Sequence, residues 1–300
     1  MRVITTLAEL AAAREAWMGE KQSCGFVPTM GYLHAGHLSL VEQARSENEV
    51  AVVSIFVNPA QFAPSEDLSR YPRDLPHDLA LLEAAGTDIV FTPAPDDIYP
   101  PDFNTYVVPS GALAERLEAA VRPGHFRGVA TVVLKLFNLV QPSRAYFGQK
   151  DAQQVAVLRR MLTDLNVPVE LLALPTIREA DGLAMSSRNS YLGAEDRLAA
   201  TALFRALQAA AASFNASADT TIASLRRTMI ETVAAEPRAT LDYADVCDPA
   251  TFEPLAELRA PMLLAIAARV GPARLIDNVL LNRDGSWNMG RRIGGQDSTR

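Results

Sequence analysis

The chain has 300 residues, 49% of them hydrophobic, and a formal net charge of −7. This size and composition allow a large buried core and predict two domains. The negative charge argues against a protein that binds nucleic acid or a membrane surface. Cys24 and Cys247 are the only cysteines, which argues against a disulfide framework. No secretory or membrane-spanning pattern is present, so we expect a cytoplasmic protein.

Residues 1–176 alternate between predicted helices and predicted strands. One strand is predicted to begin at Phe26. Others are predicted at residues 50–57, 88–92, 144–148 and 167–175, with a further short strand at 104–108. The helices cover residues 7–17, 75–85, 113–121, 129–140 and 149–166, and another begins at Leu38. This alternation is typical of an α/β fold, and we expect a Rossmann-like, doubly wound parallel sheet.

Residues 177–283 follow a different order. A polar connector at 178–191 leads to helices at 195–214 and 222–233, and strands are predicted at 241–247, 261–270 and 273–281. Helices followed by strands indicate a smaller C-terminal α+β domain. The polar, Gly-rich residues 284–300 are predicted to be a disordered tail.

The segment from Phe26 to Leu40 carries the first candidate site. An apolar strand breaks at Pro28 and Gly31, and His34 and His37 then precede a helix. The turn is expected outside the carboxyl end of a strand, where open α/β sheets bind ligands. A helix start offers unpaired N–H groups that suit phosphate, and two imidazoles add donors that can become cationic.

Two simpler interpretations of the histidines stay open at this point. His34 and His37 could be surface histidines with ordinary partners, or they could bind zinc. Zinc would need further ligands close by. The other histidines are His77 and His125, and the two cysteines are far apart in sequence, so we favour nucleotide chemistry.

Polar residues also gather at the end of the strand at 144–148 and in the connector. Lys150 and Asp151 alone would be an ordinary solvated helix start, and Met185–Arg188 alone an ordinary linker. Together with the histidines they offer positive charge, hydroxyl groups that can donate hydrogen bonds, and a carboxylate, that of Asp151, that can accept from ribose hydroxyls. Gln61 follows a strand and is expected close to the histidine turn, and its amide suits a small hydroxylated acid.

These segments carry a family resemblance. Met30–His37 resembles the HxGH element of the HIGH-type nucleotidyltransferase superfamily. Met185–Arg188 resembles the loop that closes over the ATP phosphates in those enzymes. Over residues 1–281 the chain resembles the pantothenate synthetase (pantoate–β-alanine ligase) family, with Gln149 standing where Glu is expected and His77 where another acid can occur. The other matching segments are Pro28–Gly31, Ser54–Pro59, Gln61–Phe62, Tyr71–Arg73, His125–Val129, Lys135–Val140, Phe147–Gly148, Lys150–Asp151, Gln153–Gln154 and Asp181–Asn189.

The resemblance implies a homodimeric ligase that forms pantoyl adenylate from ATP and pantoate, and then transfers the acyl group to β-alanine. It implies a catalytic set of His34, His37, Lys150, Ser186, Ser187 and Arg188. It implies that Gln61 and Gln154 bind substrate, that Asp78 binds Mg²⁺, and that the smaller domain acts as a lid. The implied ATP site comprises Met30, Gly31, Tyr32, Leu33, His34, Ala35, Gly36, His37, Gly148, Gln149, Lys150, Asp151, Ile177, Met185, Ser186, Ser187 and Arg188.

Three other functions remain open from the sequence. A cytidylyl- or adenylyltransferase with the same HxGH element would leave the nucleotide on its product. A zinc-dependent hydrolase would use His34 and His37 as ligands. A regulatory or scaffold protein would bind the nucleotide without turnover.

Overall fold

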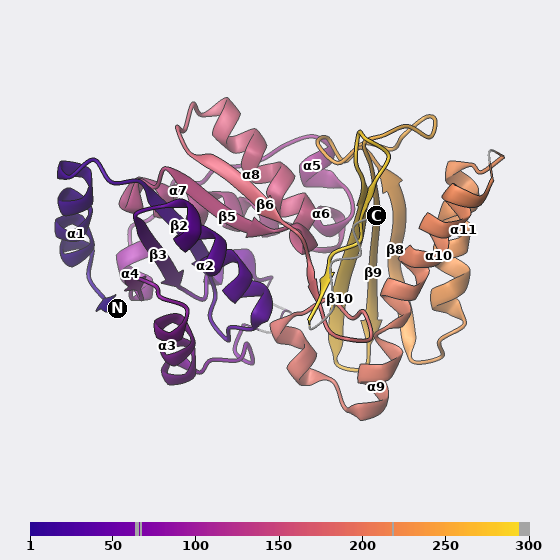
Figure 1. The fold of residues 1–300 in the computed structure, drawn as a ribbon, viewed down its shortest axis with the longest axis horizontal. Coiled ribbons are helices and arrows are strands. Elements are labelled where there is room, and N and C mark those ends of the chain that lie inside the picture. Colours follow the sequence, from indigo (N-terminus) through magenta and orange to yellow (C-terminus); the bar gives the residue numbers. More distant parts are fainter. Residues whose placement is uncertain (64–65, 67, 218, 294–300) are drawn as a thin grey trace. The chain divides into compact units, whose positions relative to one another are not determined.

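The structure is a computed structural model that describes residues 1–63, 66, 68–217 and 219–293. The chain divides into two compact units (Figure 1). Unit 1 comprises Met1–Gly148 and Val157–Leu174, and unit 2 comprises Gln149–Ala156 and Pro175–Arg300. We expected a division at 176/177, and the difference is that residues 149–156 group with the C-terminal residues.

Unit 1 is built on a six-stranded sheet in the order β1-β4-β3-β2-β5-β6. All neighbouring strands are parallel, which confirms the predicted Rossmann-like sheet. The strands are β1 (Arg2–Ile4), β2 (Cys24–Thr29), β3 (Val50–Ile55), β4 (Ile89–Phe91), β5 (Arg144–Gly148) and β6 (Glu170–Leu174). The central strands are buried on both faces, as Phe26 and Val53 illustrate, and this explains their nearly continuous apolar sequences.

The strand order places a switch point between β2 and β5. From β2 the chain proceeds through β3 to β4 in one direction, and from β5 to β6 in the other. Such connections are right-handed, so their helices cover opposite faces of the sheet. Ligands of open α/β sheets bind outside the carboxyl ends of the strands at this point. The histidine turn follows β2, and Gly148 ends β5.

The helices of unit 1 begin and end close to most predicted positions. They are α1 (Leu7–Gly19), α2 (Ala35–Glu47), α3 (Leu75–Ala84), α4 (Pro95–Ile98), α5 (Ala112–Glu115), α6 (Glu118–Val121) and α7 (His125–Val140), with a 3₁₀ helix η1 (Pro59–Gln61). Helix α8 (Ala152–Asp164) passes from unit 2 into unit 1. Thr6 caps α1 through a hydrogen bond from the Glu9 N–H.

Three predicted elements of unit 1 differ in the structure. The helix predicted at 113–121 is broken into α5 and α6, because Leu117 has a left-handed φ of 49°. The predicted strand at 104–108 is wrong, since Val107 donates its N–H to the Thr131 hydroxyl and joins no sheet. Helix α7 begins at His125, one turn before its predicted start at 129.

Unit 2 contains an antiparallel sheet in the order β11-β10-β9-β8. Helices α10 and α11 pack on this sheet, as Figure 1 shows. Its strands are β8 (Ala239–Cys247), β9 (Met262–Val270), β10 (Ala273–Leu281) and β11 (Trp287–Asn288), and its helices are α9 (Ala194–Ala199), α10 (Ala202–Ala216) and α11 (Ile222–Ala234). A C-terminal antiparallel sheet with helices confirms the predicted α+β class.

The described part of the predicted tail, residues 284–293, is ordered. Residues 284–293 include β11 and the strand β12 (Arg291–Arg292), and β12 pairs in parallel with β7 (Ile177–Arg178). The backbone N–H of Arg291 donates to the carbonyl of Thr176 at 2.7 Å. The final part of the predicted tail, 294–300, lies outside the described residues.

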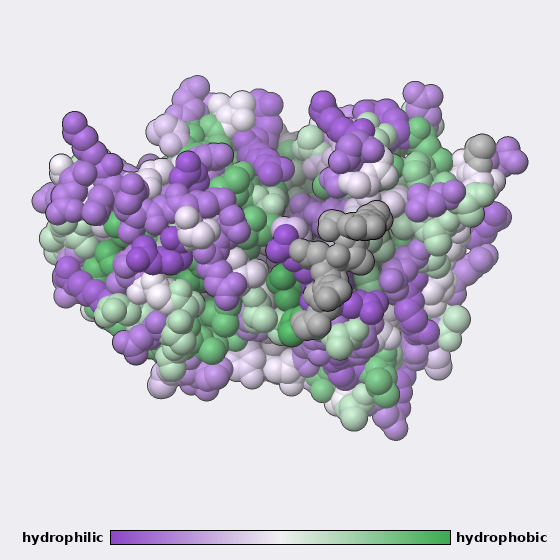
Figure 2. Space-filling model, viewed as in Figure 1, coloured by the Kyte–Doolittle hydropathy of each residue, from purple (hydrophilic) through white to green (hydrophobic). Residues whose placement is uncertain are grey.

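The described surface is mostly polar on the face that Figure 2 shows, where hydrophilic residues cover much of the outer helices. Within the described ranges, no helix is long and apolar enough to cross a membrane.

Candidate functional site

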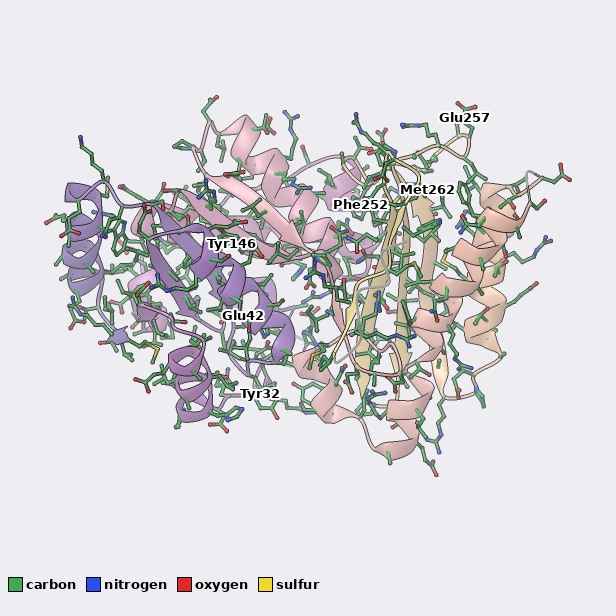
Figure 3. All side chains as sticks on the ribbon, in the orientation of Figure 1. Tyr32, Glu42, Tyr146, Phe252, Glu257 and Met262 are labelled. Carbon is green, nitrogen blue, oxygen red and sulfur yellow. The ribbon has the colours of Figure 1, made fainter. Side chains whose placement is uncertain are left out.

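The turn between β2 and α2 is tightly bent. Gly31 has a φ of 79° and Tyr32, labelled in Figure 3, has a φ of 52°, so two consecutive residues adopt left-handed conformations. A Cβ at Gly31 would lie 3.0 Å from Asp78 Oδ2, which adds a steric reason for glycine. The bend ends the strand and directs the chain into α2 at His34.

The two histidines occupy the first turn of α2. His34 is the N-cap residue, and its Nδ1 accepts a hydrogen bond from the Gly36 N–H at 3.1 Å. His37 Nδ1 accepts from the His34 N–H at 3.3 Å. The ring centroids lie 4.1 Å apart. Because each Nδ1 accepts, the proton of a neutral ring lies on Nε2, and both rings present Nε2 donors at a helix N-terminus.

Asp78 lies in α3, between β3 and β4 in the chain, and its side chain binds this turn. Its Oδ2 accepts from the Tyr32 N–H at 2.8 Å, and its Oδ1 accepts from the Leu33 N–H at 2.7 Å. The residue is 1% exposed, and burial raises the pKa of its carboxyl group. Asp78 thus binds the backbone directly before the histidines.

Gln61 lies beside the start of the histidine segment, as the neighbouring strands led us to expect. Its Nε2 lies 3.2 Å from the Met30 sulfur, and its Oε1 accepts from Asn58 Nδ2 at 2.9 Å. Asn58 also donates to the Gly128 carbonyl and accepts from the Tyr99 hydroxyl at 2.8 Å. These contacts fix the position of the Gln61 amide.

Sequence reasoning assigned no role to the polar network behind Gln61. His125 Nδ1 lies 2.9 Å from the Gln61 carbonyl, and its Nε2 lies 3.0 Å from Arg122 Nη1. Arg122 in turn forms an ion pair with Glu66 at 2.6 Å. Burial, followed by the Arg122 charge, lowers the pKa of His125 to about 4. A neutral His125 therefore donates to Gln61 and accepts from Arg122.

The signal for this network was present in the sequence. The segment His125–Val129 belongs to the family resemblance, but the helix was predicted to begin only at residue 129, directly after Gly128. In the structure a Cβ at Gly128 would lie 2.1 Å from the Ala60 carbonyl oxygen. Glycine is required there because α7 and η1 pack backbone to backbone.

Unit 2 carries the other predicted ATP-site residues except Gly148, which ends β5 in unit 1. The 3₁₀ helix η2 (Gln149–Asp151) and the 3₁₀ helix η3 (Ser187–Tyr191) both contact β10. Lys150 is mostly buried, and its Nζ lies 3.8 Å from Asp151 Oδ1. Ser186 caps η3 by accepting from the Arg188 N–H at 3.3 Å. Ile177 in β7 and Met185 also belong to this set, and Gln154, which was predicted to bind substrate, lies in α8.

The structure therefore forms two groups from the predicted site. His34, His37, Gln61 and Asp78 lie together at the end of β2 in unit 1. Lys150–Asp151 in η2 and Ser187–Arg188 in η3 belong to two segments that both contact β10 in unit 2, and Met185 and Ser186 directly precede η3.

A metal centre of protein ligands is not found in the described part of the chain, where no three His, Cys, Asp or Glu side chains are placed to hold an ion. The zinc interpretation of His34 and His37 therefore has no support there. Asp78 also fits poorly as a Mg²⁺ ligand, because it is buried and both oxygens bind backbone N–H groups.

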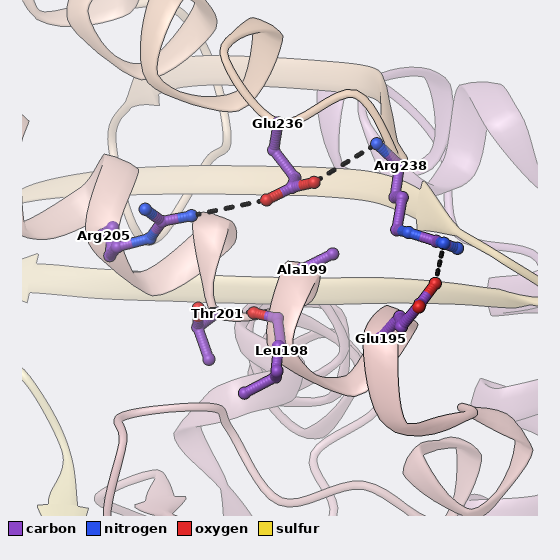
Figure 4. A pocket seen from close by; sticks show the side chains of 7 residues that line it. All are labelled: Glu195, Leu198, Ala199, Thr201, Arg205, Glu236 and Arg238. Carbon is purple, nitrogen blue, oxygen red and sulfur yellow. Dashed lines mark hydrogen bonds and ion pairs between the residues drawn. The ribbon is translucent and has the colours of Figure 1, made fainter.

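An open pocket in unit 2 lies outside both groups. Arg205 forms an ion pair with Glu236, and Arg238 forms one with Glu195 (Figure 4). Arg238 also forms an ion pair with Asp196. The remaining lining residues are Leu198, Ala199 and Thr201. Its charged side chains pair with one another, so the lining does not indicate which ligand the pocket would bind.

Comparison with known proteins identifies the family. The family model described as pantoate-beta-alanine ligase matches residues 2–280. The chain belongs to the pantoate–β-alanine ligase family. The pantothenate synthetase of Herpetosiphon aurantiacus is 56% identical over 282 residues, which cover 94% of this chain and all of the relative. That of Thermotoga neapolitana is 52% identical with the same coverage.

Solved ligase structures agree with the fold. The crystal structure of pantothenate synthetase from Thermus thermophilus has a TM-score of 0.88 and 51% identity, covering 93% of this chain and 98% of that one. Pantoate-beta-alanine ligase from Francisella tularensis, complexed with beta-gamma ATP and beta-alanine, has a TM-score of 0.77 and 34% identity, covering 93% and 97%. Family membership confirms the predicted ATP-dependent condensation of pantoate with β-alanine.

Proposed function

We propose that this pantoate–β-alanine ligase acts in two steps. A pantoate carboxylate oxygen attacks the α-phosphorus of ATP, and the bond to the β-phosphate oxygen breaks, which gives pantoyl adenylate and pyrophosphate. The amine of β-alanine then attacks the acyl carbon and loses a proton, and AMP leaves with the shared oxygen. Activation is needed because a carboxylate oxygen is a poor leaving group, whereas AMP leaves readily.

The histidine pair at the start of α2 is the observation that supports this proposal most strongly. Adenylation requires little covalent chemistry from the protein, but it does require the reactants to be aligned and the phosphate charge to be stabilised. His34 and His37 supply two Nε2 donors, and the helix start supplies a positive dipole end. His37 is the imidazole that we expect to matter most for the reaction.

The remaining roles follow from the side-chain chemistry. Lys150, Ser186, Ser187 and Arg188 bind the phosphates through charge and hydroxyl donors, and Asp151 accepts from ribose hydroxyls. Gln61 and Gln154 bind pantoate through neutral amides, which do not repel its carboxylate. The other adenosine contacts come from Met30–Gly36, Gly148, Gln149, Ile177 and Met185.

Mg²⁺ enters this proposal with ATP as part of the substrate. The ion offsets triphosphate charge and is commonly held by phosphate oxygens and water with few protein ligands. We assign Asp78 to shaping the turn before His34 rather than to the metal, because its two oxygens accept from the Tyr32 and Leu33 N–H groups.

Pyrophosphate release tests the first step. The protein is incubated with ATP, Mg²⁺ and pantoate in excess over enzyme, without β-alanine, and one burst of pyrophosphate per active site is expected. Free AMP should follow only after β-alanine is added. A nucleotidyltransferase would keep the nucleotide on its product, and a binding protein without turnover would release no pyrophosphate. Either result would contradict the proposal.

Three further features stay predictions. They are the homodimer, the cytoplasmic location and the role of the smaller domain as a lid that keeps water from the acyl adenylate. Sedimentation of the purified protein tests the first, and the rate of adenylate hydrolysis tests the last.

A further inference from the structure

Arg178, the last residue of β7, is 1% exposed and donates every N–H of its guanidinium group. Nε donates to the Met289 carbonyl at 2.6 Å, and Nη1 donates to the Gly182 carbonyl at 3.1 Å. Nη1 and Nη2 bind the two oxygens of Asp277 at 2.6 and 2.9 Å, and Nη2 also donates to the Asn278 carbonyl at 3.3 Å. The Phe204 ring lies 3.9 Å from the guanidinium carbon.

Asn278 follows Asp277 in β10 and extends the same network to η2. Its backbone N–H donates to Asp277 Oδ1 at 2.8 Å. Its side-chain Nδ2 donates to two successive carbonyls, those of Gln149 at 3.0 Å and Lys150 at 2.8 Å. Its Oδ1 accepts from Gln149 Nε2 at 3.3 Å. The Asn278 side chain therefore has partners on both its donor and acceptor ends, all in the segment that carries Lys150.

Arg178 also fixes the turn that leads to Met185–Arg188. Gly182 has a φ of 98°, and a Cβ there would lie 2.2 Å from Phe204. Glu179 N–H donates to the Leu183 carbonyl at 2.8 Å, and Met185 N–H donates to the Ile177 carbonyl at 2.9 Å. The chain thus reverses direction between Glu179 and Leu183, next to the Arg178 side chain, and continues through Met185 into η3.

Burial makes it costly to break the hydrogen bonds that join Arg178, Asp277 and Asn278. A buried ion pair is favourable only when its hydrogen bonds are satisfied, and a buried polar group that loses its partner is costly. Arg178, Asp277 and Asn278 are all at most 4% exposed. Small displacements of one member therefore move the others rather than being absorbed by solvent.

We propose that Asn278, anchored by the Arg178–Asp277 pair, is a positioning residue for the adenylation step. It fixes the main chain at Lys150, while the same ion pair fixes the turn before Ser186–Arg188. The distance between these two phosphate-binding segments, which are far apart in the sequence, is thereby held constant, so that both can bind the same triphosphate. This inference rests on the phosphate-binding roles in the proposed function and adds a residue that does not itself touch ATP.

Asn278→Ala tests the inference, because it removes two donors without adding a charge. In steady-state assays of pyrophosphate release with ATP, Mg²⁺, pantoate and β-alanine all present, we expect kcat/KM for ATP to fall about 10- to 100-fold in protein that is still folded at the assay temperature. Asn282→Ala is the matched control, since Asn282 follows β10 and its amide donates to Ser286 Oγ. That variant should keep wild-type kcat/KM. Asn278→Ser provides a second variant if the alanine protein unfolds.

A double-mutant cycle with Lys150→Ala separates positioning from a general structural role. Single-turnover rates are measured with enzyme in excess. If Asn278 acts through Lys150, adding Asn278→Ala to Lys150→Ala should lower the rate by less than about 2-fold. An equal loss in both backgrounds, or a wild-type rate for Asn278→Ala, would overturn the inference alone. A wild-type rate for Lys150→Ala would overturn the Lys150 role and the inference together.

Discussion

Asp78 and Leu33 are 45 positions apart in sequence, yet the Asp78 carboxylate accepts a hydrogen bond of 2.7 Å from the Leu33 N–H. The second oxygen of Asp78 accepts from Tyr32. One buried side chain on α3 therefore holds the turn whose next residue, His34, caps α2. This relationship connects a residue that contacts no substrate in our account to the placement of both imidazoles.

Replacing Asp78 by Asn should disturb the turn, because an amide can accept from only one of the two N–H groups. We expect adenylation to slow about 10- to 100-fold and the free energy of unfolding to fall by about 1.5–3 kcal/mol. The Mg²⁺ concentration for half-maximal rate should not change. Asp74→Asn, which alters the N-cap of the same helix, is the control. A variant that regains full rate at high Mg²⁺ would instead indicate a metal ligand.

His37→Ala should remove one phosphate donor at the start of α2. By analogy with the loss of one transition-state donor, we expect about a 10²- to 10³-fold lower rate of pyrophosphate release. Thermal unfolding should shift only slightly, because losing the capping bond from the His34 N–H leaves the Asp78 contacts that hold the turn in place. His77→Ala replaces an exposed histidine of α3 and should behave as wild type. Near-normal release from His37→Ala would exclude the assigned role.

Gln61→Ala should weaken pantoate binding while ATP binding stays nearly constant. The Gln61 amide is held by Asn58 and lies next to Met30, so its removal leaves the histidine turn in place. We expect KM for pantoate to rise by at least about 10-fold and KM for ATP to change by less than about 2-fold. Initial rates with each substrate varied in turn provide the check. The reverse pattern would remove the pantoate assignment.

His125 should make folding stability depend on pH. Its folded pKa of about 4 lies below the ordinary value of 6.5, so the unfolded chain binds the proton more readily. The stability from this group is complete above pH 6.5 and is lost as pH falls toward 4, by an amount on the order of 3 kcal/mol. Urea unfolding of His125→Asn at pH 7 and 4.5 should show a smaller pH dependence than wild type. Equal pH dependence would contradict a buried neutral His125.

Local patterns predicted the parts of the structure that depend on neighbouring residues. The strand, turn and helix around Gly31 and His34 follow from apolar runs, a glycine and a capping position. The nearness of Gln61 to that turn followed from parallel neighbouring strands. The family resemblance then supplied residue roles that spacing alone could not provide.

The remaining features depend on contacts between distant residues. Arg178 and Asp277 pair across 99 positions, and no periodicity marks either of them. Strand β1 has only three residues, which is too short for a pattern, and it is stabilised by pairing with β4. Gly128 resembled a helix break in sequence, but close packing against Ala60 explains it.

Transfer of an oxygen label tests the adenylate intermediate most directly. Pantoate labelled with ¹⁸O in its carboxylate is converted with ATP, Mg²⁺ and β-alanine, and the nucleotide product is analysed by mass spectrometry. Attack of the carboxylate on the α-phosphorus predicts one ¹⁸O atom in the phosphate of AMP. Unlabelled AMP, or label found in inorganic phosphate with ADP as the nucleotide, would contradict the account.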